Sequence, residues 1–562
     1  MKTENLNRQK LIVLGAHQSG KTSLVRTLAG GKSYLTRANT DSTRMVHFKA
    51  WTTENHVDFL LTDLGGADVY MHTHHLFLDA KALYLLVYDH RSYTPQRHEV
   101  ALGRWLDLLY MHVPGAVVKI VGTQCDLAYD DINEKIRQQV RACLDEQLKS
   151  YALKIKQEIL AINSSLDDSS AGELSRPEIE QLKRQKARLV SLARSPLRVH
   201  HHIATLDSTA DGVQQVLALV QALEVMAVNN ELFPHAQREI PAAWSSLRHQ
   251  LHRSKQYCMT LDQIKQQAAA LNVDTLECLH YLHDIGDVLW YDTYPVLCDV
   301  VFTKPRKLVE TLNSLFNHEM DVYLDYDKNR ALMAKGGMDK RKFETAKENF
   351  QTSGLISRDL LKALWFYENL SYDQFNYLVE LIPHFNLCYT IPQSDIPLHY
   401  YDYQPLMVVP TFVSDVQPQD LTNVWSEQPE SHVLELGVSL SFPMFYPSGL
   451  LEKLSCRIQE HVYERTDWQD LIRADLDQST LLICRCLDPQ TYDCVLKLAM
   501  RGASLESVRN DLATVYSQLK LILDQYPGLV WYQRLTTQHC EKYYKTECFP
   551  ENVFSNCSTV ES

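Results

Sequence analysis

Residues 15–22 read Gly-Ala-His-Gln-Ser-Gly-Lys-Thr, which is the spacing G-x-x-x-x-G-K-T. Residues 10–14 before them form an apolar run with the length of a buried strand, and apolar residues at helical spacing follow them. A glycine loop between a strand and a helix can turn backbone N–H groups toward an anion, and the helix N-terminus adds a favourable dipole. The sequence therefore predicts a phosphate-binding loop at the start of the chain.

The two residues that end this motif have chemical roles in such a site. The Lys21 ammonium can reach the outer phosphates of a nucleotide, and the Thr22 hydroxyl is a suitable ligand for Mg²⁺. The residues that we expect to surround the phosphates are Gly15, His17, Gln18, Ser19, Gly20, Lys21, Thr22 and Ser23.

Composition excludes several classes of function. The formal net charge of the 562-residue chain is −13, which argues against a general nucleic-acid binder and against binding to an anionic membrane surface. No apolar run approaches the roughly 20 residues that a membrane span requires. Thirteen cysteines are scattered without a disulfide pattern, and neither Cys484-Arg485-Cys486 nor the group Cys540, Cys548 and Cys557 has zinc-like spacing. We therefore expect reduced thiols and a cytoplasmic protein without a membrane span.

A second motif follows the predicted strand 57–62. Asp63 comes at the end of this strand and is followed by Leu64, Gly65 and Gly66. A carboxylate in that place can hold Mg²⁺ through water, and the Gly66 N–H can bond to a γ-phosphate. Coming soon after a phosphate loop, the pattern D-x-x-G indicates a nucleoside triphosphate site.

A third motif indicates which base is bound. The predicted strand 116–122 ends on Thr123-Gln124-Cys125-Asp126. A carboxylate at Asp126 can accept two hydrogen bonds, from guanine N1–H and from the 2-amino group, and adenine supplies neither. This motif favours guanine over adenine and therefore speaks against an ATPase.

The three motifs in this order resemble those of the Ras-like GTPases, and residues 66–78 are similar to the second switch of Roc, the GTPase domain of the Roco family. The resemblance implies an α/β fold, a mixed sheet with helices on both faces, that binds GTP or GDP with Mg²⁺. It implies Lys21, Thr43 and Gly66 as catalytic residues around the γ-phosphate, and Thr22, Thr43 and Asp63 as magnesium ligands. It also implies a nucleotide-binding role for Thr123, Gln124 and Asp126, and for the loop Leu206-Asp207-Ser208 that would close over the base.

The sequence departs from the Ras-like pattern in both switches. Ala67 stands where a water-orienting Gln is usual, and a methyl group cannot position water. Asp68 could contribute instead, although its charge would repel the γ-phosphate. In the first switch Thr43 has Thr40 as a rival for the magnesium-ligand role, and Arg44 is a candidate cis arginine or an ordinary exposed residue.

The rest of the chain resembles COR, the domain that follows Roc in Roco proteins. The resemblance and the hydrophobic patterns predict Roc at residues 1–228 with an inserted helical hairpin at about 131–195, a winged-helix-like COR N-terminal half at 229–400, a COR C-terminal half of α+β type at 401–535 and a tail at 536–562. Leucine-rich repeats and a kinase signature are not recognised. The chain is therefore similar to the kinase-less malignant fibrous histiocytoma-amplified subgroup, as a bare Roc-COR module or as part of a longer chain.

Two segments leave alternatives open. The hairpin is either a solvated excursion or a partner-binding arm. Residues 442–446, with Phe442, Met444, Phe445 and Tyr446, are either local core or part of a dimer interface, because grouped aromatic residues serve both.

Two functions of different class fit these observations. The first is a slow Mg²⁺-dependent GTPase that acts as a signalling switch through a COR homodimer, which the resemblance implies. The second is a scaffold that binds the nucleotide without meaningful hydrolysis, which Ala67 favours. The signalling partners are not predictable from the sequence.

Overall fold

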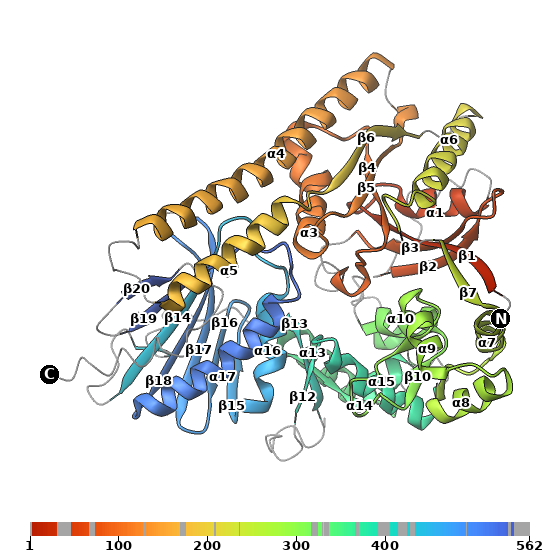
Figure 1. The fold of residues 1–562 in the computed structure, drawn as a ribbon. Coiled ribbons are helices and arrows are strands. Elements are labelled where there is room, and N and C mark those ends of the chain that lie inside the picture. The colour runs from red at the N-terminus through yellow and green to blue at the C-terminus, as the bar shows by residue number, and fades with distance from the viewer. Residues whose placement is uncertain are drawn as a thin grey trace.

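The structure is a computed structural model, and it describes the chain in segments. These are residues 3–30, 46–66, 74–127, 130–168, 176–206, 210–234, 237–315, 324–328, 330, 337–365, 370–391, 405–413, 424–426, 433–489, 492–537 and 541–544. Three regions follow one another in Figure 1, coloured from red and orange through green to blue.

The first region is built on a sheet of seven strands in the order β2-β3-β1-β4-β5-β6, with β7 beside the N-terminal part of β1. β1 pairs in parallel with β3 and β4, and β5 joins β4 to β6, whereas β2 runs antiparallel to β3. The strands are β1 (Thr3–Leu14), β2 (Val46–Thr52), β3 (Asp58–Leu64), β4 (Leu83–Asp89), β5 (Val117–Thr123), β6 (Arg198–Thr205) and β7 (Gln237–Pro241).

Helices cover both faces of this sheet, because its central strands are apolar on both sides. α1 (Lys21–Gly30) and α6 (Ala210–Ala227) pack on the face of Leu11 and Val13. α3 (Arg104–His112) and α4 (Asp130–Asp168) pack on the face of Ile12 and Leu14. The predicted mixed α/β fold with helices on both faces is thus confirmed.

β1 is longer than the sequence predicted. The apolar pattern predicted a strand at residues 10–14 only, but residues 3–7 continue it by pairing antiparallel with β7. A polar edge segment of this kind has no hydrophobic period to reveal it, since its partner lies more than 200 residues away in the sequence.

The second region contains two three-stranded antiparallel sheets with helices beside them. The first sheet has the order β8-β10-β9 and follows α7 (Ala242–Arg253); the second has the order β11-β13-β12. The helices and strands of this second region, besides α7, are β8 (Cys258–Thr260), α8 (Leu261–Ala270), α9 (Thr275–Asp284), β9 (Leu289–Trp290), β10 (Val300–Phe302), α10 (Pro305–Leu315), α13 (Lys340–Ser353), β11 (Gly354–Ser357), α14 (Arg358–Leu364), α15 (Tyr372–His384), β12 (Tyr389–Thr390) and β13 (Pro405–Val413).

One strand lies in a different sheet from the one predicted. The sequence pattern placed residues 405–410 in the C-terminal half, but β13 pairs with β11 and β12 of the second small sheet. We therefore propose that the C-terminal half begins beyond Val413. The other predicted boundaries stay predictions.

The third region is an antiparallel sheet of seven strands in the order β15-β16-β17-β18-β14-β19-β20. Helices α16 and α17 pack on one face, where Leu440, Ile483, Leu498 and Leu512 belong to one buried cluster. The elements are β14 (Leu434–Phe442), α16 (Leu450–Ile458), β15 (Glu464–Asp467), β16 (Leu471–Asp475), β17 (Ser479–Leu487), β18 (Cys494–Gly502), α17 (Leu505–Leu523), β19 (Tyr532–Thr537) and β20 (Glu541–Tyr544).

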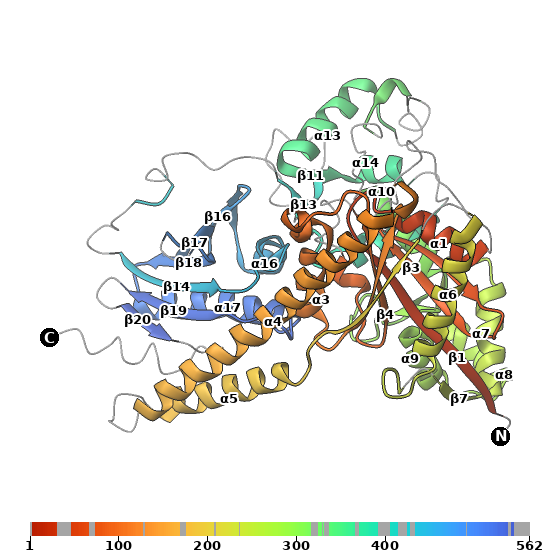
Figure 2. The same ribbon diagram turned by 90° about the horizontal axis from the view of Figure 1, so that it is seen from above.

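The helical hairpin of α4 and α5 (Arg176–Ala193) leaves the first region and runs alongside the third, as both views show (Figure 1, Figure 2). Arg188 of α5 donates to the carbonyl oxygens of Tyr526 at 3.3 Å and Leu529 at 2.8 Å. The hairpin is therefore not only a solvated excursion: part of it packs within the same chain.

Candidate functional site

The loop at residues 15–20 connects β1 to α1 at the carboxyl edge of the sheet. Gly15, Gln18 and Gly20 have positive φ angles of 143°, 61° and 84°. A Cβ at Gly15 would lie 2.0 Å from the Val87 carbonyl oxygen, so only glycine fits there. The loop thus curls over the end of the sheet, with His17 and Gln18 exposed at its tip and Ser23 in the first turn of α1.

Lys21 lies beneath this loop and closes it. Its side chain is buried, and Nζ donates to the carbonyl oxygens of Gly15 and Ala16 at 2.8 Å each. Burial lowers the pKa of Lys21 to about 8, the Asp63 carboxylate opposes that shift, and the Arg104 charge adds to it. An ammonium has three donors, so two bonds to the loop leave a third for an anion.

Thr22 and Asp63 meet at the edge shared by β1 and β3. The Thr22 hydroxyl donates to Asp63 Oδ2 at 2.8 Å, and Asp63 is fully buried. The two residues come together because β1 and β3 are parallel neighbours that end side by side. A hydroxyl and a carboxylate are oxygen ligands of the kind that Mg²⁺ prefers.

Gly66 brings the backbone after β3 directly against the phosphate loop. A Cβ at Gly66 would lie 2.5 Å from Lys21 Nζ and 2.6 Å from the backbone nitrogen of His17. No side chain fits in that space, so the Gly66 backbone can approach whatever the loop holds. The residues present therefore fit a phosphate group with Mg²⁺: Lys21 would meet the phosphate, and Thr22 and Asp63 would hold the metal.

The motif at the end of β5 supports the loop from the side. Thr123 Oγ1 donates to the Ser19 carbonyl oxygen at 2.7 Å, and Gln124 Nε2 donates to the Gln18 carbonyl oxygen at 3.2 Å. Asp126 is exposed in the short turn that follows, and its carboxylate is accessible to a ligand. Thr123 and Gln124 thus position the loop, which the sequence did not reveal.

The end of β6 lies next to the same turn. Leu206 is buried; its N–H donates to the Gly122 carbonyl oxygen at 2.8 Å, and its own carbonyl accepts from the Cys125 N–H at 3.2 Å. Leu206 therefore fixes the turn that carries Asp126. Asp207 and Ser208 lie outside the described residues, as do Thr40, Thr43, Arg44, Ala67 and Asp68.

Two family models match the chain. The model for Roc, described as the Ras of Complex domain of DAP kinase, matches residues 10–126, and the model for COR-A, described as the domain C-terminal of Roc, matches residues 241–413. The chain belongs to the Roco family. The resemblance inferred from the motifs is thus confirmed, and the site described above is that of a Ras-like Roc domain.

The similar proteins agree with the predicted subgroup. Malignant fibrous histiocytoma-amplified sequence 1 homolog of Mus musculus is 25% identical over 95% of this chain and 55% of its own length. Its Homo sapiens counterpart is 24% identical over the same shares. The probable serine/threonine-protein kinase pats1 of Dictyostelium discoideum is 20% identical over 99% of this chain and 15% of its own length.

The Roco chain described here spans about half the length of the first two of these relatives. Among solved structures, Methanosarcina barkeri Roco2 RocCORdC bound to GDP matches 73% of this chain and 97% of its own, with 16% identity and a TM-score of 0.42. No helix in the described part of the chain is long and apolar enough to cross a membrane.

Two residues near the Roc site were not assigned a role from the sequence. His74 is fully buried, lies 2.9 Å through Nε2 from the Gly65 carbonyl oxygen, and has its ring 5.4 Å from that of Trp105. Arg104 begins α3, close enough to affect the pKa of Lys21. His74 belongs to the segment that resembles the second switch, but its own role, like that of Arg104, was not predicted because it depends on how α3 packs on the sheet.

Proposed function

We propose that this Roco chain binds guanine nucleotides with Mg²⁺, hydrolyses GTP slowly to GDP and acts as a signalling switch through its Roc and COR regions. The observation that carries the proposal is the meeting of Lys21, Thr22, Asp63 and Gly66 at one edge of the sheet. The guanine preference rests on Asp126, next to the strand end that supports the loop.

Nucleotide binding is tested with fluorescent GDP and GTP on the purified chain. Lys21→Ala should abolish phosphate contact, and Asp126→Asn should weaken guanine nucleotides while improving xanthine nucleotides, because the hydrogen-bond pattern is inverted. Tyr526→Phe, in the C-terminal half, is a control that leaves both contacts in place. Wild-type guanine affinity in a folded Asp126→Asn variant would overturn the assignment of the base motif.

The alternative is a scaffold that binds nucleotide and does not turn it over. Ala67 supports this alternative, because no glutamine is available there to orient water. Single-turnover GTP hydrolysis separates the two functions. Conversion of bound GTP that is lost in Thr22→Asn supports the GTPase, and bound GTP that persists unchanged for hours supports the scaffold.

We also propose that the chain forms a cytoplasmic homodimer through its C-terminal half. The resemblance to the Roco family is what suggests this dimer. The aromatic group at 442–446 does not support it, because Phe442 is buried in the C-terminal core and Phe445 packs against Tyr110 and Tyr151 of the same chain. These two residues therefore belong to the intramolecular packing. Light scattering across concentration, with GDP and with a GTP analogue, tests the dimer, and a monomer in every state contradicts it.

A further inference from the structure

The turn that carries Asp126 is held from two other elements of the Roc domain. The Cys125 N–H donates to the carbonyl oxygen of Leu206, directly after β6, at 3.2 Å. The Cys125 carbonyl oxygen accepts from Nδ2 of Asn133, near the start of α4, at 3.3 Å. Both peptide groups of Cys125 are therefore fixed, and with them the two backbone angles that set the direction in which Asp126 follows.

The strand end before this turn is supported by β4. Tyr88 and His90 are almost fully buried, and the Tyr88 hydroxyl oxygen lies 2.9 Å from His90 Nδ1. The His90 N–H donates to the Thr123 carbonyl oxygen at 3.0 Å. A Cβ at Gly122 would lie 2.9 Å from the Tyr88 hydroxyl oxygen, so a glycine lets β5 approach this pair closely. β4 thus supports the base motif as far as Thr123, where the turn with the carboxylate begins.

Guanine recognition depends on the direction of this carboxylate. Asp126 can accept from guanine N1–H and from the 2-amino group only when both hydrogens point at its oxygens, because hydrogen bonds weaken steeply at angles below about 120°. Hypoxanthine keeps the N1–H and lacks the 2-amino group, so it can make only one of these two bonds. A turn that lets the carboxylate rotate therefore weakens a guanine nucleotide more than a hypoxanthine nucleotide.

We propose that Asn133 is a positioning residue for guanine recognition, because its amide holds the Cys125 carbonyl oxygen and thereby orients the Asp126 carboxylate toward the base. The inference rests on the guanine-nucleotide site of the proposed function. Asn133 comes seven positions after Asp126 and lies outside the T-x-x-D motif. Its amide bonds to the main chain of the turn, so it acts on the base through Asp126.

A purely structural role for Asn133 predicts different behaviour. If the amide only fixed the start of α4 against the sheet, its loss would lower the stability of the chain and weaken all nucleotides by the same factor. A positioning role instead changes the ratio of two affinities, which a general loss of stability leaves unchanged.

The experiment measures displacement of fluorescent GDP by unlabelled GDP and by inosine diphosphate on the purified chain with Mg²⁺. Asn133→Ala should weaken GDP on the order of tenfold and inosine diphosphate less, so that the ratio of the two affinities falls roughly threefold. Asn133→Asp keeps the size but sets an acceptor against the carbonyl oxygen, and it should lower the ratio at least as much. Gln138→Ala, at an exposed position of the same helix that contacts Glu134 at 3.4 Å, is the matched control and should keep the parent ratio.

The outcomes separate this inference from the proposed function. A parent chain that does not bind GDP, or an Asp126→Asn variant with unchanged base selectivity, would contradict the proposed function. If Asp126→Asn changes the selectivity but Asn133→Ala keeps the parent ratio, or weakens both nucleotides equally, the positioning role is wrong and the proposed function stands. Circular dichroism checks folding, and Asn133→Asp serves alone if the alanine variant does not fold, because an acidic residue is favourable in the first turn of a helix.

Discussion

The Roc domain contacts the rest of the chain through two interfaces that differ in their polar contacts. Toward COR-A the contacts include a buried charge cluster: Asp287 accepts from Arg8 of β1 across the interface at 2.5 Å and from Arg248 within COR-A, and its side chain is almost fully buried. Toward the C-terminal half the contacts are aromatic rings and main-chain bonds. Tyr151 lies 5.6 Å from the Phe445 ring, and the Gly528 N–H donates to the Met111 carbonyl oxygen at 2.9 Å. The first interface thus contains a buried charge cluster, and the second contains packed rings and close main-chain contacts.

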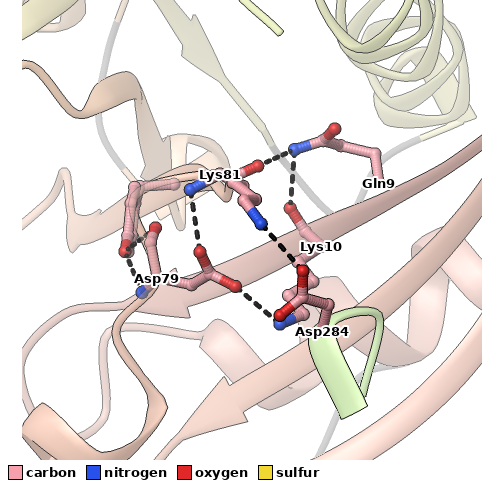
Figure 3. A network of polar contacts seen from close by, with 6 residues as sticks. Gln9, Lys10, Asp79, Lys81 and Asp284 are labelled. Atoms are coloured by element: carbon pink, nitrogen blue, oxygen red, sulfur yellow. Dashed lines mark hydrogen bonds and ion pairs between the residues drawn. The ribbon is translucent and has the colours of Figure 1, made fainter. Parts of the chain in front are cut away.

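A polar network lies beside this interface, next to the amino end of β4 (Figure 3). Lys10 of β1 pairs with Asp79 at 2.5 Å, and Lys81 pairs with Asp284 at the end of α9 at 3.1 Å. Asp79 precedes β4, at the end of the segment that follows Gly66. Ion pairs rearrange at less cost than packed rings, so we expect the COR-A interface to be the adjustable one.

The largest expected effect comes from Asp287→Ala. It removes the carboxylate and leaves Arg8 and Arg248 poorly exposed without their counter-charge, which should cost about 3–5 kcal/mol. Chemical denaturation measures the loss, and hydrogen exchange in β1 and α7 locates it. The double variant Arg8→Met with Asp287→Ala should recover part of it. A loss below about 1 kcal/mol would mean that the Asp287 charge cluster contributes little to the stability of the chain.

Acid should act with opposite sign on two buried carboxylates, Asp287 at the COR-A interface and Asp107 inside the Roc domain. Asp107 of α3 accepts from Gln147 at 2.9 Å and from Tyr151, and burial raises its pKa to about 6. A raised carboxyl pKa gives stability that is present below the unfolded value near 4 and is lost as pH rises through 6. Between pH 7 and pH 5 the packing of α3 on α4 should therefore become more stable, by about 1.4 kcal/mol.

Asp287 responds in the other direction. Three partners, His252, Arg8 and Arg248, hold the pKa of Asp287 below its usual range against the effect of burial. Its contribution is present above about pH 4 and is lost as pH falls further. Segment-resolved hydrogen exchange at pH 7, 5 and 3.5 separates the two windows. Asp107→Asn should remove the change between pH 7 and 5, and an unchanged profile in that variant would contradict the assignment.

Gly528→Ala tests the interface with the C-terminal half. A Cβ at this position would lie 1.8 Å from the Tyr110 carbonyl oxygen, which is main chain and cannot rotate away. We expect a loss of about 1–3 kcal/mol, with faster exchange in α3 and no change in β1 and α7. Tyr526→Phe, which loses only the 3.0 Å bond from Lys453, is the control in the same segment, at about 1 kcal/mol. An alanine variant as stable as the parent would show that this contact is loose.

The sequence predicted the Roc site far better than these interfaces. Lys21, Thr22 and Asp63 follow strands whose hydrophobic runs are visible, and parallel strands bring their ends together, so local patterns were sufficient. The Asp287 cluster joins residues 279 and 39 positions apart, and no local period marks it. Phe442 and Phe445 could not be assigned to core or interface from sequence, because Phe442 is buried by the C-terminal core and Phe445 by rings of α3 and α4, which are distant in sequence.

The smallest effect should come from Asp284→Asn, three residues from Asp287 on the same turn. Lys81 and Asp284 are both about half exposed, so water and salt screen their attraction, and losing it should cost less than about 1 kcal/mol. The loss should shrink further when the ionic strength rises from 0.05 to about 0.5 M. The Asp287→Ala loss, from a buried cluster, should persist at high salt. Denaturation of both variants at low and high salt therefore compares two carboxylates of one interface. If both losses fall equally with salt, burial does not distinguish them, and the charged contacts of the COR-A interface are surface features throughout.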